Sequence, residues 1–136
     1  MTTRTDIPTI ESDSRPFWDG VRDEGEFRLV RCRACDRVHH YPRPFCPHCW
    51  SDDVEWIAAS GDATLYTYSV VYMNDLAPFK DELPYVAAIV ELAEGPRVMT
   101  RLVSCALDEL AVGMPLTMTT ARLTEDVTIP LFAPAR

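Results

Sequence analysis

The sequence predicts a mainly β protein, built from an N-terminal helix, a small metal-stapled module and a five-stranded barrel. Three observations support this prediction. Four cysteines fall in two close pairs within residues 32–49, five stretches of alternating apolar and polar residues follow residue 61, and prolines outnumber glycines by 11 to 5. Alternation with a period of two is typical of half-buried strands, and frequent prolines favour fixed turns over long helices.

Length and composition limit the chain to one small core with an appendage. It has 136 residues, of which 47% are hydrophobic and 25% charged, as in an ordinary globular protein. No stretch reaches the ~20 apolar residues of a membrane-spanning helix, and the first fifteen residues contain acids and lack the apolar core of a signal peptide. We expect a cytoplasmic protein without membrane contact, divided into a tail and helix at 1–25, a metal module at 26–60 and a barrel at 61–136.

The N-terminal helix is predicted over residues 15–24. Ser14 can cap its start, Pro16 fits the first turn where its missing N–H costs nothing, and Gly25 can end it. Phe17, Trp18 and Val21 fall on one side of this helix and give it an apolar stripe. The stripe either packs on the protein's own domain or docks a partner.

Five predicted strands form the barrel. They cover residues 64–73, 84–92, 97–103, 115–123 and 127–132, separated by Gly, Pro, Asp or Asn. A helical hint at residues 108–111 lies between the third and fourth strands, which is where an OB-fold places its helix. In the first strand, alternation places Tyr66, Tyr68, Val70 and Tyr72 on one face and Leu65, Thr67, Ser69 and Val71 on the other. We expect the tyrosines to serve as core or as an interface.

The charge balance argues against nucleic acid as the main partner. The chain has 13 basic and 21 acidic residues, a net charge of −8, and residues 61–136 hold 5 basic and 10 acidic ones. Aromatic side chains on an OB-fold strand can stack bases, but affinity for DNA or RNA also requires that phosphates be neutralised. Nucleic-acid binding is therefore the minor alternative for the tyrosine face.

The cysteine spacing carries the clearest chemical signal. Cys32, Cys35, Cys46 and Cys49 form C-x2-C-x10-C-x2-C, the two chelating pairs of a zinc ribbon. Four thiolates complete a tetrahedral zinc site and leave no open position, so we expect one structural zinc per chain. A redox pair or an iron site is the alternative, as is a ligand drawn from His39, His40 or His48.

Several residues around this motif admit two interpretations. Zinc knuckles commonly place glycine after the second cysteine, but Asp36 and Trp50 stand there, and a left-handed backbone is costly for Trp50, so we expect a less regular second knuckle. The nearby arginines Arg31, Arg33, Arg37 and Arg43 offset the negative thiolates in the simplest interpretation. The lone Cys105 is interpreted as a small buried apolar residue and not as a nucleophile.

The order of helix, four-cysteine ribbon and barrel resembles the zinc-ribbon and OB-fold family of small proteins associated with thiolases and other acyl-CoA enzymes. The resemblance covers about residues 14–134. It rests on the segments RPFWDG, LVRCRACDRVHHYPRPFCPHC, SDDVEW, SGDATLYTYSVVY, PYVAAIVEL, RVMTRLV, VGMPL and PLFAPA. The most specific parts are HYPR between the cysteine pairs and the SG and PYV that open the first two strands. The chain departs from the family at Asp36 and Trp50.

The resemblance implies a rubredoxin-like zinc ribbon, an OB-fold barrel and a non-catalytic accessory subunit. Its partner would be a thiolase-like aldolase, an acyltransferase or an enoyl-CoA hydratase. Coenzyme A carries phosphates, which makes the same four arginines, Arg31, Arg33, Arg37 and Arg43, candidates for contact with its nucleotide end. Candidates for the partner interface are Phe17, Trp18, Tyr66 and Tyr68.

Two other classes of function stay open at this point. One is a free-standing acyl-CoA or nucleic-acid binding module, which a co-purification test separates from an accessory subunit. The other is a catalyst in its own right, which requires an acid, base or nucleophile. The sequence contains no G-x-S-x-G, phosphate loop, dinucleotide fingerprint or H-E-x-x-H, and we nominate no catalytic residue.

Overall fold

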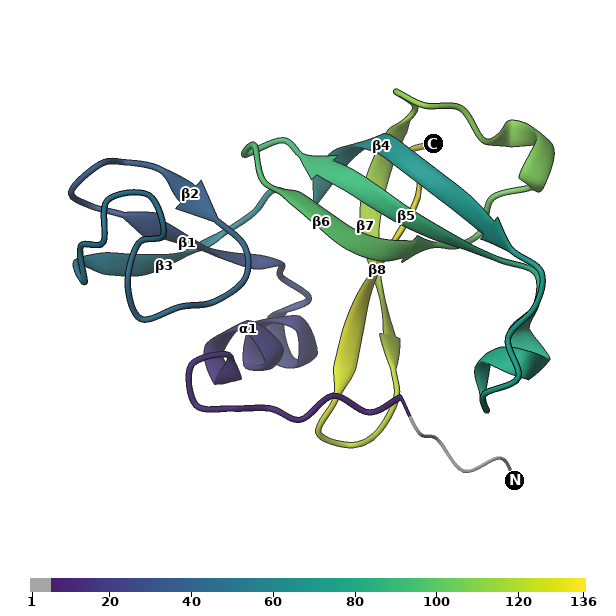
Figure 1. The fold of residues 1–136 in the computed structure, drawn as a ribbon, viewed down its shortest axis with the longest axis horizontal. Coiled ribbons are helices and arrows are strands. Elements are labelled where there is room, and N and C mark those ends of the chain that lie inside the picture. Colours follow the sequence, from purple (N-terminus) through teal and green to yellow (C-terminus); the bar gives the residue numbers. More distant parts are fainter. Residues whose placement is uncertain (1–5) are drawn as a thin grey trace.

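The computed structural model describes residues 6–136 and has the predicted order of helix, ribbon and barrel. Figure 1 shows the ribbon at one end, the barrel at the other and helix α1 beside their junction. Every helix in residues 6–136 is too short or too polar to span a bilayer.

The N-terminal helical segment lies where the sequence placed it, in two parts. Helix α1 spans Arg15–Asp19 and continues into a wider π-helical turn, η1, at Gly20–Glu24. Gly25 ends it in the left-handed conformation, with φ 63°, which glycine adopts at little cost. Ser14 is the N-cap residue as predicted, but the expected side-chain cap is wrong, because its hydroxyl donates to the Glu11 carbonyl at 3.2 Å and makes no capping hydrogen bond to the helix.

The ribbon is a three-stranded antiparallel sheet of order β2-β1-β3. Its strands are β1 at Arg28–Cys32, β2 at Val38–His39 and β3 at Val54–Ala58. The central strand β1 pairs over its whole length with β3. Since β1 ends at Cys32, the sheet fixes the first cysteine of the metal motif.

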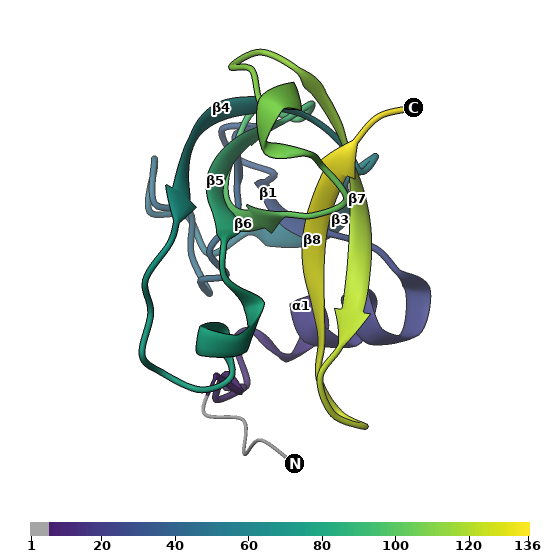
Figure 2. The same cartoon turned by 90° about the vertical axis from the view of Figure 1, so that its right-hand side faces the viewer.

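The barrel is closed, with strand order β4-β5-β6-β8-β7. Its strands are β4 at Asp62–Val71, β5 at Tyr85–Leu92, β6 at Arg97–Leu102, β7 at Pro115–Arg122 and β8 at Thr128–Pro134. Short 3-10 turns lie between β4 and β5 (η2, Phe79–Glu82) and between β6 and β7 (η3, Leu107–Glu109). β6 and β8 run parallel and the other neighbours antiparallel, so this is the predicted five-stranded OB-fold, which Figure 2 shows enclosing its interior.

The first barrel strand departs from simple alternation. Leu65 pairs with Val90, but Thr67 pairs with Ile89, so Tyr66 is an extra residue in a β-bulge. After the bulge, Tyr68 lies opposite the buried Ala88, on the same face of the sheet. The predicted faces are therefore wrong: one inserted residue moves the side chains after it to the opposite face.

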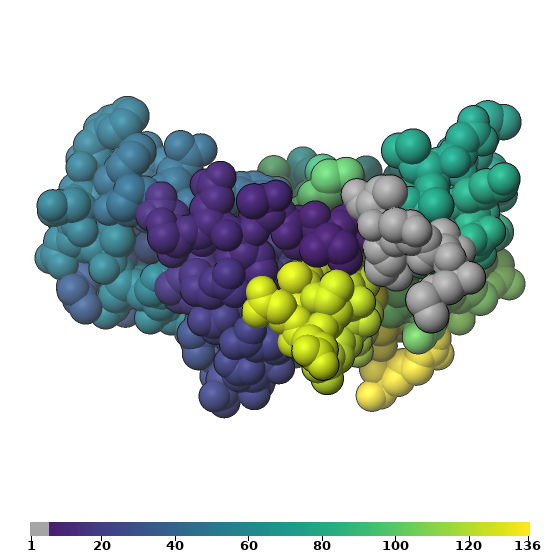
Figure 3. All heavy atoms as spheres, turned by 90° about the horizontal axis from the view of Figure 1, so that it is seen from below, coloured from purple at the N-terminus to yellow at the C-terminus, as the bar shows by residue number. Residues whose placement is uncertain are grey.

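One hydrophobic core joins the three parts. Phe17 and Val21 of the helical segment and Phe27 and Leu29 of the ribbon lie in the same buried cluster as the barrel interior. The rings of Phe27 and Phe132, which is in β8, are 6.4 Å apart. In Figure 3 the N-terminal segment lies against the β7–β8 hairpin. The ribbon is thus packed onto the barrel and not merely tethered to it.

Candidate metal centre and junction cavity

The four cysteines of the motif converge at the tips of two knuckles. Their Sγ atoms all lie within 4.8 Å of one another, with Cys32 and Cys49 3.5 Å apart and Cys35 and Cys46 3.6 Å apart. Each of these two close pairs takes one cysteine from each knuckle, so the two knuckles together supply the four ligands of one tetrahedral site. Four sulfur ligands at this spacing fit one zinc ion. Because they leave no coordination position open, the site is of the structural kind.

The two knuckles share one backbone geometry. The Asp36 N–H donates to the Cys32 carbonyl at 2.8 Å, and the Trp50 N–H donates to the Cys46 carbonyl at 2.9 Å. Asp36 has φ 66° and Trp50 has φ 67°. The expected irregularity of the second knuckle is therefore wrong: Trp50 takes the left-handed position, and its ring stacks on Phe45 with centroids 5.4 Å apart.

The pKa values of the thiols of Cys46 and Cys49 are shifted in opposite directions. Burial raises the pKa of Cys46, but the N–H groups of Cys49 and His48 outweigh it and bring that pKa down to about 7. The Ser51 N–H lowers the pKa of Cys49, but the neighbouring thiols, Cys32 first, raise it to about 12. Without a cation the cluster retains protons at pH 7. Metal loading therefore releases protons and is favoured by rising pH.

The three histidines lie outside the sulfur cluster. His39 is buried in β2, and burial, with the nearby charges of His48 and Arg43, lowers its pKa. His48 is exposed and its Nδ1 lies 3.3 Å from Arg37 Nη1. His40 points away into the junction, between Phe27 and Tyr41, with ring centroids 4.8 and 4.4 Å away. Within residues 6–136 the metal site is made of cysteines alone.

Of the four arginines Arg31, Arg33, Arg37 and Arg43 in the ribbon, the first two bind carboxylates among residues 6–136 and the last two do not. Arg31 binds Asp36 at 2.7 Å, and Arg33 binds Asp53 and Glu55 at 3.1 Å each. Arg37 contacts His48, and neither it nor Arg43 forms an ion pair with a carboxylate of the described chain. Among these four arginines, Arg37 and Arg43 therefore carry the positive charge that is left without a carboxylate partner in the part of the chain that the structure describes.

The candidate interface residues differ in exposure. Phe17 is 5% exposed and belongs to the core, and Trp18 beside it is half-buried. Tyr66 and Tyr68 are 44% and 37% exposed, and the guanidinium of Arg97 lies 3.9 Å above the Tyr66 ring. Tyr72, which the sequence analysis placed on the tyrosine face, is 70% exposed, and Met73 and Leu76 in the segment after β4 are exposed apolar residues that the sequence analysis did not nominate.

Cys105 lies far from this chemistry. It is half-buried, not buried as expected, and packs at the edge of the core. Burial, together with nearby Glu109 and Asp108, raises the pKa of its thiol. A thiol that holds its proton is a poor nucleophile, in keeping with the structural interpretation.

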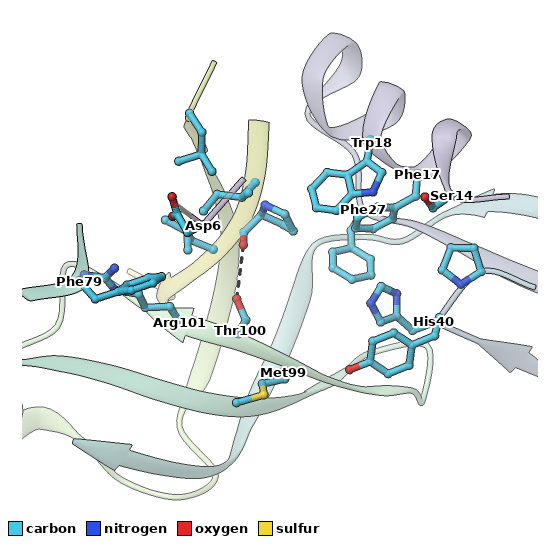
Figure 4. Close-up of a pocket in the computed structure, with 16 residues that line it drawn as sticks. Asp6, Ser14, Phe17, Trp18, Phe27, His40, Phe79, Met99, Thr100 and Arg101 are labelled. Atoms are coloured by element: carbon cyan, nitrogen blue, oxygen red, sulfur yellow. Dashed lines mark hydrogen bonds between the residues drawn. The ribbon is translucent and has the colours of Figure 1, made fainter. Parts of the chain in front are cut away.

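A cavity of about 510 Å³ lies where helix, ribbon and barrel meet. One wall is aromatic and comes from the helix and ribbon, while the other comes from β6 and β8 (Figure 4). Its lining is mostly apolar and includes Trp18, His40 and Tyr41 on the first wall and Met99 and Ile129 on the second. The sequence analysis did not find this cavity, although it singled out Phe17, Trp18 and His40.

Two family models match adjoining parts of the chain. Residues 19–55 match "ChsH2, rubredoxin-like zinc ribbon domain", and residues 56–121 match "ChsH2, C-terminal OB-fold domain". A "DUF35 domain-containing scaffold protein" of Methanocaldococcus jannaschii is 39% identical over 112 residues, which cover 80% of this chain and 77% of that protein. The chain belongs to the DUF35 family.

This DUF35 chain is also similar to a subunit of a probable enoyl-CoA hydratase and to a chain of an aldolase. A "Probable enoyl-CoA hydratase alpha subunit" of Thermomonospora curvata is 38% identical over 94% of this chain, which spans 39% of that relative's length. In the solved "Ltp2-ChsH2(DUF35) aldolase", one chain is 37% identical and superposes with a TM-score of 0.82, covering 94% of this chain and 98% of that one. The likeness supports both the zinc-ribbon assignment and the predicted family resemblance.

Proposed function

We propose that this protein is a non-catalytic accessory subunit of an enzyme that acts on acyl-CoA thioesters. The observation that carries the proposal is the match to the DUF35 chain of an aldolase, which covers 98% of that chain. The hydratase subunit from Thermomonospora curvata adds a second enzyme of CoA chemistry with the same module. The partner we propose is therefore a thiolase-like aldolase or an acyl-CoA hydratase.

The exposed apolar side chains support a binding task. Tyr72, Met73 and Leu76 follow β4 and are 70%, 82% and 66% exposed, which is unusual for side chains of this size in one short segment. Tyr66 and Tyr68 of β4 are also exposed, at 44% and 37%. We propose that the partner contacts this segment and, separately, the half-buried Trp18 of the helical segment; Phe17 is 5% exposed, packs in the core and has little surface to offer.

The ribbon arginines support contact with the nucleotide end of CoA. Arg31 and Arg33 are engaged by carboxylates, so we narrow the proposed phosphate contact to Arg37 and Arg43. Guanidinium groups without a carboxylate partner keep their charge and donors for phosphate oxygens. We also propose a cytoplasmic location, because a four-thiolate zinc site requires a reducing compartment.

Reconstitution tests the proposal. Candidate thiolase-like and hydratase subunits of the source organism are each co-expressed with this chain, and the mixture is analysed by size-exclusion chromatography with light scattering. We expect a stable complex with one of them, and turnover of acyl-CoA that is lost when this chain is omitted. Turnover by this chain alone, or a partner whose rate does not depend on it, would contradict the proposal.

A further inference from the structure

The junction cavity lies on the face of the barrel that OB-folds use to bind ligands. In this fold, the second and third strands and the loops between strands one and two and between four and five form the binding face. Here Met99 and Arg101 come from the third barrel strand, Phe79 from the first of these loops and Leu123 from the start of the second. The cavity thus occupies a face already suited to binding.

The barrel topology explains why this face is open. β6 and β8 pair directly only at Leu102 and Phe132. Farther along, the Thr100 hydroxyl reaches the Pro130 carbonyl at 3.4 Å, and Pro130 has no N–H to extend the sheet. The two strands therefore part, and the volume between them and the helix is the cavity.

The walls present hydrocarbon from both sides. Phe17 meets Trp18 and Phe27 edge-to-face, with centroids 5.1 Å apart in each case, so the aromatic wall is fixed by its own packing. Figure 4 shows Trp18, His40 and Met99 around one space. Burial brings the pKa of His40 down to about 4, so at pH 7 this ring adds no charge to the wall.

The charged groups at the cavity disfavour an anion. The guanidinium of Arg101 forms an ion pair with Glu82 and lies 4.6 Å from the centroid of the Tyr85 ring. Because Glu82 already matches the charge of Arg101, a carboxylate that enters loses its hydration without gaining a free cation, whereas a neutral chain has no charge to desolvate.

We propose that the junction cavity binds the hydrocarbon part of an acyl group held as a neutral ester or thioester. This inference rests on the proposed function, because the acyl-CoA substrate supplies the group. The volume of 510 Å³ lies in the range of small-molecule sites. Tyr41 and Pro42 of the wall directly precede Arg43, so the CoA nucleotide would extend toward the ribbon.

The test uses the zinc-loaded chain without a partner and follows tryptophan fluorescence and calorimetry. The probes are methyl octanoate, octanoate, octanoyl-CoA and CoA. We expect saturable binding of methyl octanoate, weaker binding of octanoate, and octanoyl-CoA bound about tenfold more tightly than CoA. No saturable binding of the ester, or tighter binding of the carboxylate, would overturn the proposal.

Matched variants locate the site. Tyr41→Ala and Met99→Ala remove lining side chains that are 58% and 71% exposed, so neither should unfold the chain. Val112→Ala and Leu107→Ala remove apolar side chains that are 68% and 41% exposed and do not line the cavity. We expect the first pair to weaken methyl octanoate binding about fivefold and the second pair to leave it unchanged.

The remaining outcomes separate this inference from the proposed function. If all four variants bind the ester alike, the cavity is not the site. If the ester does not bind and Tyr41→Ala or Met99→Ala instead weakens assembly with the partner enzyme, a protein segment fills the cavity; the acyl site is then wrong while the accessory function stands. If acyl binding occurs and no partner assembles, only the accessory function fails.

Discussion

The ribbon and the barrel of this protein obtain their stability in different ways. The ribbon has strands of five, two and five residues, and two of its buried side chains are the thiols Cys32 and Cys46. The barrel has strands of ten, eight, six, eight and seven residues around a continuous apolar interior. A module below about 40 residues rarely folds on its own apolar burial, so we expect the ribbon to need its metal in addition to the core that it shares with the barrel, and the barrel to fold without metal.

This difference bears on function because the junction cavity takes one wall from each region. Its aromatic wall includes His40 and Tyr41 of the ribbon, and its aliphatic wall includes Met99 and Ile129 of the barrel. Zinc therefore contributes to the cavity without touching it, by holding the segment that carries one wall. A loss of metal should open the cavity while the barrel keeps its fold.

The largest effect we expect follows removal of one ligand from the metal centre. Wild-type protein should contain one zinc per chain, and Cys46→Ser should abolish stoichiometric zinc and unfold the ribbon, because structural zinc contributes about 10 kcal/mol or more to such modules. Elemental analysis and circular dichroism measure both. Cys105→Ser is the matched control and should retain zinc. A zinc content below about 0.3 per wild-type chain, or full zinc in Cys46→Ser, would contradict the closed site.

The barrel should respond to a cavity in its core instead. Phe132 is fully buried in β8 and its ring faces Phe27 across the junction. Phe132→Ala should lower the free energy of unfolding by about 3–5 kcal/mol, measured by urea denaturation, while zinc content below the transition stays at one. Leu107→Ala, at a 41% exposed side chain, should change stability by less than about 0.5 kcal/mol. Zinc loss from folded Phe132→Ala would mean that the two regions are not separable.

Acid should weaken the junction between the regions. The folded pKa of His40 is about 4, below its ordinary 6.5, because burial disfavours the charged ring. The folded state thus binds fewer protons, and stability present above pH 6.5 should fall by up to about 3 kcal/mol as the pH drops toward 4. His40→Phe should reduce this slope and His48→Gln should keep it, in urea titrations over the pH range where zinc stays bound. Equal slopes in His40→Phe and wild type would contradict the assignment.

The smallest effect concerns the second knuckle. Trp50 has φ 67°, so its backbone favours glycine over any other residue. Trp50→Gly and Trp50→Ala both lose the stack on Phe45, and their difference isolates the backbone. We expect the glycine variant to be more stable by about 1 kcal/mol in zinc-competition and thermal unfolding experiments. If alanine were equal or better, the left-handed geometry of this knuckle would be in error.

The features predicted well from the sequence are those that short segments determine. The four cysteines form a metal set because chelation requires two ligands within a few residues of each other, and this spacing is visible in the chain. Strand positions followed from period-two alternation, and the helix from Pro16 and Gly25. The bulge at Tyr66 was missed because one inserted residue leaves the alternating pattern intact and changes only the pairing.

The remaining features depend on contacts between distant segments. The cavity brings together Phe17, His40, Phe79 and Ile129, and no local pattern indicates that these side chains meet. The ion pairs of Arg33 with Asp53 and Glu55 depend on the pairing of β1 with β3. Trp50 was expected to resist a left-handed backbone, but the same hydrogen bond, from the N–H of the residue after the second cysteine to the carbonyl of the first, closes both knuckles in one conformation.

The most direct test of the account is a two-dimensional amide NMR spectrum of the isotope-labelled chain before and after zinc is removed by a chelator. We predict that signals from the ribbon strands β1, β2 and β3 collapse to unfolded positions and that those near Tyr41 and Trp18 shift. Signals from the barrel interior, such as Val90 and Leu116, should stay dispersed. Collapse of the whole spectrum, or a ribbon that stays folded without zinc, would contradict the claim that metal builds one region and apolar packing the other.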